Sequence, residues 1–92
     1  MSHYLKAIKR FDEGVAAYLR RDYKGSIKKF TQALKHEPNL TLAYSSRGAA
    51  HLKAGSAQKA VNDLNRAIRL NPNYARAHHL RGRGLSQAGL CS

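Results

Sequence analysis

Apolar residues recur at helical spacing in successive segments of this chain, with polar residues between them. The first segment runs from about Ser2 to Arg20, and its apolar positions share one face of a predicted helix. A second segment ends near His36, because Pro38 disfavours helical backbone at the preceding residue. Three further segments run from about 41 to 53, between 56 and 71, and from about 75 to 88. The pattern predicts five helices and no strand, and therefore an all-α fold.

The turns between the predicted helices contain residues that helix ends favour. Gly55 offers the left-handed backbone conformation that often terminates a helix, and Gly89 occupies the same place one period later. Ser56 has the hydroxyl of a typical N-cap for the helix that follows. Each pair of helices is therefore expected to form a tight hairpin.

The sequence repeats with a period of 34 residues, which Gly14, Gly48 and Gly82 mark at equal spacing. Other matching pairs are Phe30 with Leu64, Ala33 with Ala67, Leu34 with Ile68, and Pro38-Asn39 with Pro72-Asn73. A period of this length is typical of a helical array, in which each hairpin buries its apolar face by stacking on the next. We expect a single domain over residues 1–92, with units at 7–40 and 41–74 and an incomplete unit at 75–92.

These residues give the chain a resemblance to the tetratricopeptide repeat family. In that family a small residue lets the paired helices approach closely, and the three glycines match it, with Ser26 and Ala60 as the facing small residues. The sequence departs from the family at two aromatic positions of each unit, which hold Arg10, Tyr44 and His78, and then Ala17, His51 and Leu85. The resemblance implies a curved solenoid of about five antiparallel helices, namely two full helix-turn-helix repeats and a closing helix.

The resemblance also implies a groove for a partner protein. In such proteins the first helix of each unit lines the concave surface, which holds an extended or helical peptide segment. The candidate groove residues are Phe11, Val15, Tyr18, Ser45, Ala49, Leu52, Lys53, Arg76, His79 and Arg83. They change from apolar to basic along the chain, so the expected segment is acidic. In a plainer alternative, the larger apolar ones among them pack against neighbouring helices.

One use of such repeats is to hold the carboxylate end of heat-shock chaperones with Lys, Asn and Arg side chains on the concave face. At the corresponding positions this chain has Phe11, Val15, Ser46, Arg76 and Leu80. Only Arg76 carries the required charge. A standard reader of chaperone tails is therefore not expected.

The chain is strongly basic, with 17 Lys and Arg against 5 Asp and Glu and a formal net charge of +12. This charge favours acidic partners, and we interpret the chain as a protein-interaction module or scaffold. The alternative is nucleic-acid binding through the basic surface. The aromatic residues of the chain do not alternate with Arg, as they do in stacking platforms for nucleic acid, and its cations are scattered over several helices. A protein-interaction module is therefore favoured. Cations on the second helices are expected to be solvated: Lys24, Lys28, Lys29, Lys35, Lys59, Arg66 and Arg69.

Other classes of function have little support in the residues. No nucleophile, base and orienting group recur in a recognisable arrangement, so an enzyme is not expected. His78 and His79 are adjacent on a predicted helix and point apart, so neither a metal nor another cofactor is expected. The single Cys91, and the lack of an early apolar stretch long enough for a signal peptide or membrane helix, favour a reducing, cytoplasmic setting.

The unfinished third unit suggests self-association. A terminal repeat normally has a polar outer face, whereas Leu85 and Leu90 are expected to be partly uncovered. Two such ends could cover one another in a symmetric homo-oligomer. Arg47 and Arg81 occupy one repeat position, and we expect them to share a structural role beside the glycine.

Overall fold

The structure, a computed structural model, describes residues 2–89 and contains five α-helices in that range. The predicted all-α repeat fold is confirmed, and the helix ends lie close to the expected ones. The helices are α1 (His3–Leu19), α2 (Tyr23–His36), α3 (Thr41–Lys53), α4 (Ala57–Leu70) and α5 (Ala75–Gln87).

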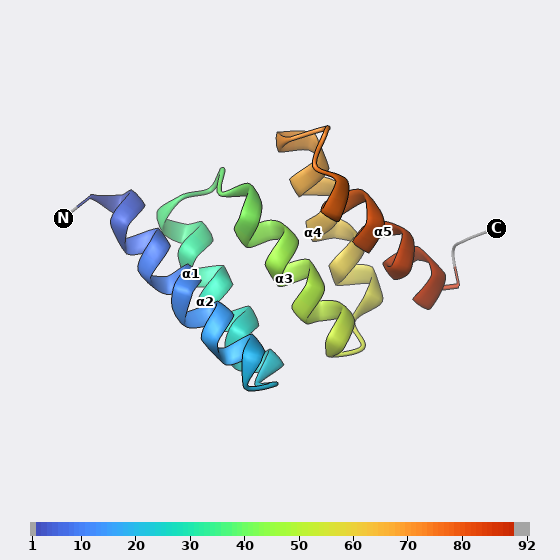
Figure 1. The fold of residues 1–92 in the computed structure, drawn as a ribbon, viewed down its shortest axis with the longest axis horizontal. Coiled ribbons are helices and arrows are strands. Elements are labelled where there is room, and N and C mark those ends of the chain that lie inside the picture. Colours follow the sequence, from blue (N-terminus) through green and yellow to red (C-terminus); the bar gives the residue numbers. More distant parts are fainter. Residues whose placement is uncertain (1, 90–92) are drawn as a thin grey trace.

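The helices stack in two layers along a body that measures 47 × 28 × 17 Å. Figure 1 shows α1, α3 and α5 in the near layer, α2 and α4 behind them, and α1 and α5 at opposite ends. Each helix packs mainly on its neighbours in the chain, and α3 also touches both α1 and α5. The first helices of successive units therefore form one continuous surface.

The helix ends lie at the predicted turn residues, but the capping hydrogen bond expected of Ser56 is not formed. Gly55 and Gly89 have positive φ angles of 83° and 72°, as expected of helix-terminating glycines. At the equivalent place in the first unit, Arg21 has a φ angle of 64°. Residues other than glycine rarely adopt this backbone conformation. Ser56 occupies the N-cap of α4, but its side chain makes no capping hydrogen bond. The equivalent Asp22 does cap α2, and its Oδ1 accepts a hydrogen bond from a first-turn backbone N–H at 3.0 Å.

Glycines let the two helices of each complete unit cross closely. A β-carbon added at Gly14 would come within 2.6 Å of the Phe30 ring, and one added at Gly48 within 2.9 Å of Leu64. Both large side chains are almost completely buried. They occupy the space that a longer side chain would need, which gives the hairpins their dense packing. At Gly82, in contrast, a β-carbon would meet no atom of the described residues within 4 Å.

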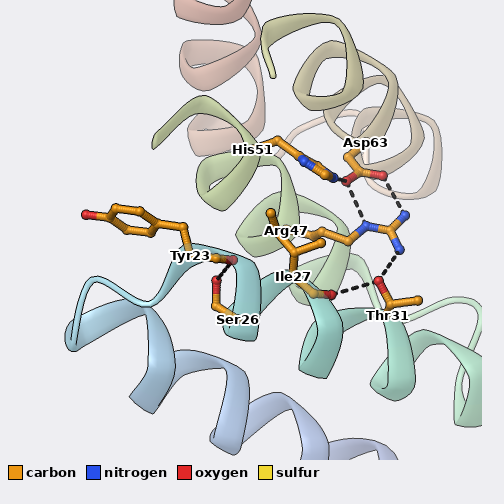
Figure 2. A network of polar contacts seen from close by, with 7 residues as sticks. All are labelled: Tyr23, Ser26, Ile27, Thr31, Arg47, His51 and Asp63. Carbon is orange, nitrogen blue, oxygen red and sulfur yellow. Dashed lines mark hydrogen bonds and ion pairs between the residues drawn. The ribbon is translucent and has the colours of Figure 1, made fainter. Parts of the chain in front are cut away.

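Arg47 joins three helices through the network shown in Figure 2. Its Nε and Nη2 donate hydrogen bonds to the two carboxylate oxygens of Asp63 on α4, at 2.8 and 2.7 Å. Its Nη1 donates to Thr31 Oγ1 on α2 at 3.1 Å. Asp63 is buried and Arg47 is mostly covered, so water weakens this bidentate pair little. The hydrogen bonds to Asp63 raise the pKa of the Arg47 guanidinium above its ordinary value. Arg47 therefore links three helices beside Gly48, a structural role of the kind expected from its position in the repeat.

The first unit has a longer and more exposed ion pair at the same repeat positions, with the charges exchanged. Glu13 corresponds to Arg47 and Lys29 corresponds to Asp63 in the repeat. Lys29 Nζ lies 3.6 Å from Glu13 Oε1. In both complete units, the residue before the glycine therefore forms an ion pair with the residue 16 positions later.

His51 gives the stability of the fold a dependence on pH. Its Nε2 lies 3.6 Å from Asp63 Oδ2, and its Nδ1 is buried with no hydrogen-bond partner in residues 2–89. Burial lowers the pKa of His51, Asp63 opposes this shift, and Arg47 and Lys59 add to it. The unfolded chain therefore takes up a proton here at a higher pH than the folded chain. We expect His51 to have no effect above about pH 6.5, and below it to lower the free energy of unfolding by at most about 1.4 kcal/mol per pH unit.

Urea unfolding at about pH 7.5 and about pH 5.5 measures this dependence on either side of an ordinary histidine pKa. His51→Gln should lose the part of the pH dependence that His51 causes. His79→Gln, which changes an exposed histidine, should keep it. If His51→Gln retained the full pH dependence of the native chain, other groups would be its source.

A candidate peptide-binding groove

Two adjoining hollows open on the surface formed by α1, α3 and α5. Tyr18, Ala49 and Arg76 line both of them, so the two are continuous. Their volumes are about 280 and about 440 Å³. We call this continuous depression the α1–α3–α5 groove.

The end of the groove nearer α1 is mainly apolar. Val15, Leu19 and the ring of Phe30 line it together with Tyr18 and Ala49, two of the three shared residues. The Tyr18 ring packs edge-on against the ring of Tyr23 at a centroid distance of 5.4 Å, which restrains its orientation. An apolar ligand side chain placed here would lose contact with water, at a gain of about 25 cal/mol per Å² of buried area.

The end of the groove nearer α5 is basic. Lys53, Arg76, His79 and Arg83 line it, and all four are exposed. No Asp or Glu of the described residues lines either hollow. Within residues 2–89, moreover, none of these four side chains forms an ion pair. The positive charge of Lys53, Arg76 and Arg83 is therefore available to a ligand, and its attraction is strongest at low salt.

Eight of the ten predicted groove residues line the hollows, namely Val15, Tyr18, Ala49, Leu52, Lys53, Arg76, His79 and Arg83. Phe11 does not; it is half-buried with its ring centroid 5.5 Å from that of Phe30. The Phe11 ring therefore packs on a ring of α2. Ser45 does not line the hollows either, because it is only 1% exposed and its Oγ donates a hydrogen bond to Leu42 O at 3.1 Å. The next residue, Ser46, lines the groove in its place.

Further lining residues were not among the predicted groove set: Leu19, Phe30, Ser46, Leu80 and Gln87. Helical spacing could have indicated four of them. Leu19 follows Val15, Leu80 follows Arg76 and Gln87 follows Arg83, each by four residues. Ser46 precedes Ala49 by three, so each of the four lies on the same face as a predicted residue. The sequence offered no comparable signal for Phe30, which comes from the second helix of its unit.

The described residues show neither a metal centre nor a membrane segment. No group of three or more His, Cys, Asp or Glu side chains between residues 2 and 89 could hold a metal ion. In that same range, no helix has the length and apolar character needed to cross a membrane. Leu90 and Cys91, which the sequence also singled out, lie outside the described residues.

Comparison with known proteins identifies the family. A sequence model of the tetratricopeptide repeat matches residues 41–74, the second unit. The TPR2B domain of yeast Sti1, solved as a complex with pHsp70, is 30% identical to this chain and has a TM-score of 0.89. The match covers 91% of this chain and 67% of that domain. The chain belongs to the tetratricopeptide repeat family.

Other members of the TPR family share the fold and part of the sequence. The second TPR domain of Spaghetti (RPAP3), bound to the HSP90 peptide SRMEEVD, has a TM-score of 0.88 and 26% identity over 90% of this chain and 77% of that one. The Protein STIP1 homolog of Dictyostelium discoideum is 32% identical over 73 residues, or 79% of this chain and 13% of the relative. This TPR chain spans between 10% and 22% of the length of eight curated relatives that it matches.

Proposed function

We propose that this TPR domain is a protein-interaction module that binds an acidic segment of a partner protein in the α1–α3–α5 groove. The segment places an apolar side chain against Val15, Tyr18 and Leu19, and its carboxylates beside Arg76 and Arg83. One observation carries the proposal: an apolar hollow continues into a basic one, and no described acidic side chain lines either. The proposed activity is binding, in the cytoplasmic setting expected from the single cysteine.

The bound peptide of the Spaghetti complex has the chemistry that this groove fits. SRMEEVD combines the apolar residues Met and Val with two Glu and a final Asp. The groove offers apolar lining at one end and four cationic or titratable basic side chains at the other. This match supports an acidic peptide as ligand and makes SRMEEVD a suitable probe.

We further propose that the groove recognises acidic side chains more than a terminal carboxylate. At three of the five positions where TPR domains that hold chaperone tails have polar clamp residues, this chain has Phe11, Val15 and Leu80. Phe11 packs on a neighbouring ring, Val15 lines the apolar hollow and Leu80 is 7% exposed. None of the three can donate a hydrogen bond to a carboxylate.

Reversing two charges in the groove tests the proposal. We expect Arg76→Glu/Arg83→Glu to bind a fluorescently labelled SRMEEVD peptide about tenfold more weakly than the native chain, which is about 1.4 kcal/mol. The physical reason is that two attractive contacts become repulsive. Fluorescence anisotropy at constant ionic strength gives both dissociation constants. Amidation of the peptide's C-terminus should weaken binding by less than about threefold, because three of the five clamp positions lack donors.

The matched control is Lys24→Glu/Lys28→Glu, which changes the net charge equally on exposed positions of α2. Lys29 is unsuitable for this purpose, because its ammonium group pairs with Glu13. The control should weaken binding by less than about threefold, because these charges act on the ligand only through the screened general field. Equal losses in the two variants would contradict a specific groove and point to general cationic attraction, as nucleic-acid binding through the basic surface requires.

A further inference from the structure

A separate hollow lies between the first half of α1 and the end of α2. Lys6, Lys9, Arg10 and His36 line it, and its volume is about 310 Å³. None of these four residues lines the α1–α3–α5 groove. The two helices run antiparallel in one hairpin (Figure 1), so both walls of the hollow belong to the first unit. We call it the α1–α2 basic hollow.

The fold does not require basic residues at these four positions. In the second unit, the 34-residue repeat places apolar residues there, namely Leu40, Ala43, Tyr44 and Leu70. With them, α3 and α4 form the same kind of hairpin as α1 and α2. Basic side chains gathered around one hollow repel one another, which does not favour folding. The difference between the units at all four positions therefore indicates a ligand of negative charge.

Most of the positive charge around the hollow is not compensated within the chain. Lys6 and Lys9 are exposed, and neither forms an ion pair among residues 2–89. Arg10 Nη1 donates a hydrogen bond to Glu13 Oε1 at 2.8 Å, which holds one edge of the guanidinium group and offsets its charge. Glu13 itself does not line the hollow. The two lysine charges therefore remain available to a ligand.

His36 adds a hydrogen-bond donor from the opposite wall. Its ring centroid lies 6.1 Å from that of His3, and the two ring planes are inclined by 28°. This stacking restrains the orientation of the imidazole. A neutral imidazole carries one N–H group and a protonated one carries two. An anion in the hollow can therefore receive hydrogen bonds from both helices.

We propose that the α1–α2 basic hollow binds a small phosphate monoester. Near neutral pH such a phosphate carries a charge of about −1.5 to −2, which matches the two available lysine charges. Its oxygens accept hydrogen bonds from Lys6, Lys9, Arg10 and His36. The hollow is at the lower end of the range of about 300–1,000 Å³ for small-molecule sites, so the phosphate is carried by a group the size of a sugar. This site goes beyond the proposed peptide-binding function and does not depend on it.

Inositol monophosphate is the probe, because it is a phosphate monoester on a ring the size of a sugar. We expect it to bind the native chain at about 0.15 M salt with a dissociation constant of about 1 mM or lower. An NMR titration of the backbone amides measures this constant, and the largest shifts should fall on the four residues of the hollow. Inorganic sulfate has a similar charge but no carrier, so it should bind at least about threefold more weakly.

The residues of the second unit provide a variant that the repeat already accommodates. Lys6→Leu/Lys9→Ala places the residues of positions 40 and 43 in the first unit and leaves Arg10 unchanged. We expect it to bind inositol monophosphate about tenfold more weakly than the native chain. The matched control, Lys24→Gln/Lys28→Gln, removes the same charge from exposed positions of α2 and should bind within about threefold of the native chain. Circular dichroism checks that both variants remain folded.

Vesicles distinguish a lipid headgroup from a soluble ligand as the source of the phosphate. Phosphatidylcholine vesicles with phosphatidylinositol monophosphate are compared with vesicles in which phosphatidylserine supplies the same surface charge. Stronger sedimentation of the native chain with the former, lost in Lys6→Leu/Lys9→Ala, supports a lipid headgroup in the hollow. Equal sedimentation with both, together with binding of inositol monophosphate in solution, supports a soluble ligand in the same hollow.

The hollow and the groove can be tested separately. Arg76→Glu/Arg83→Glu should bind inositol monophosphate within about threefold of the native chain at about 0.3 M salt, where the general field is screened. Conversely, Lys6→Leu/Lys9→Ala should bind the SRMEEVD peptide within about threefold of the native chain under the same conditions. Either proposal can therefore fail while the other stands.

Four outcomes would overturn the phosphate site. Inositol monophosphate does not bind the native chain, or it binds Lys6→Leu/Lys9→Ala as tightly. Inorganic sulfate binds as tightly as inositol monophosphate, which would leave only general attraction of anions. A single-stranded oligonucleotide binds more than about tenfold tighter than inositol monophosphate and is lost in Lys6→Leu/Lys9→Ala, which would assign the hollow to nucleic acid.

Discussion

Replacement of Gly48 by leucine is expected to lower the free energy of unfolding by about 3 kcal/mol or more, the upper end of the range for overpacked interiors. A β-carbon at this position lies 2.9 Å from Leu64 Cγ and 3.4 Å from the backbone oxygen of Ala60. The side chain of Leu64 is fully buried, so it has little room to move, and the backbone of α4 would have to shift. Urea unfolding followed by circular dichroism measures the effect.

The matched control is the same substitution one unit later. At Gly82 the new side chain meets no described atom within 4 Å, and leucine favours a helix over glycine by up to about 1 kcal/mol. Gly82→Leu should therefore leave the free energy of unfolding unchanged or raise it. If Gly48→Leu and Gly82→Leu had equal effects, the close crossing of α3 and α4 at Gly48 would be wrong.

Replacement of Asp63 by lysine is expected to lower the free energy of unfolding by about 3 kcal/mol or more, as is usual when one partner of a buried ion pair is removed. The substitution takes both carboxylate acceptors from Arg47 and adds a like charge beside it. Arg47 would keep only its hydrogen bond to Thr31. The same measurement on Lys28→Asp, at an exposed position of α2, should show a change within about 0.5 kcal/mol.

A charge exchange at this pair tests the arrangement seen in the first unit. The double variant Arg47→Glu/Asp63→Lys places Glu and Lys where Glu13 and Lys29 stand in the repeat. It should recover more than half of the stability lost in Asp63→Lys, because the two residues again attract one another. A double variant as unstable as Asp63→Lys would mean that the pair acts through its bidentate geometry and not through opposite charge.

The order and bounds of the helices could be predicted because they depend on local signals. Helical spacing of apolar residues, Pro38 after α2, and the glycines at positions 55 and 89 act within a few residues of where they stand. The period of 34 residues then indicated which helices form a hairpin, since Gly14 and Gly48 recur with the large residues that cover them. The family resemblance added the surface formed by α1, α3 and α5, and most of the predicted groove residues do line it.

The details of the groove could not be predicted to single residues. Ser45 and Ser46 are adjacent, and a rotation of about 100° per residue places one in the interior and the other on the groove. Which of the two faces inward depends on how α3 is rotated against its neighbours, and local sequence does not set that angle. The same holds for Phe11, whose ring packs on Phe30 and lines neither hollow.

The sequence by itself determined the helical repeat, the pairing of helices and the basic character of the chain, because these follow from periodicity and composition. Only the tertiary structure decided which charges are used inside the fold and which remain available. Arg47 and Arg81 look identical in the repeat, yet one is held by Asp63 and the other has no carboxylate beside it in the described residues. The physical reason is that an ion pair depends on a second helix at a distance of a few ångströms, and whether that helix is present is a property of the packed array.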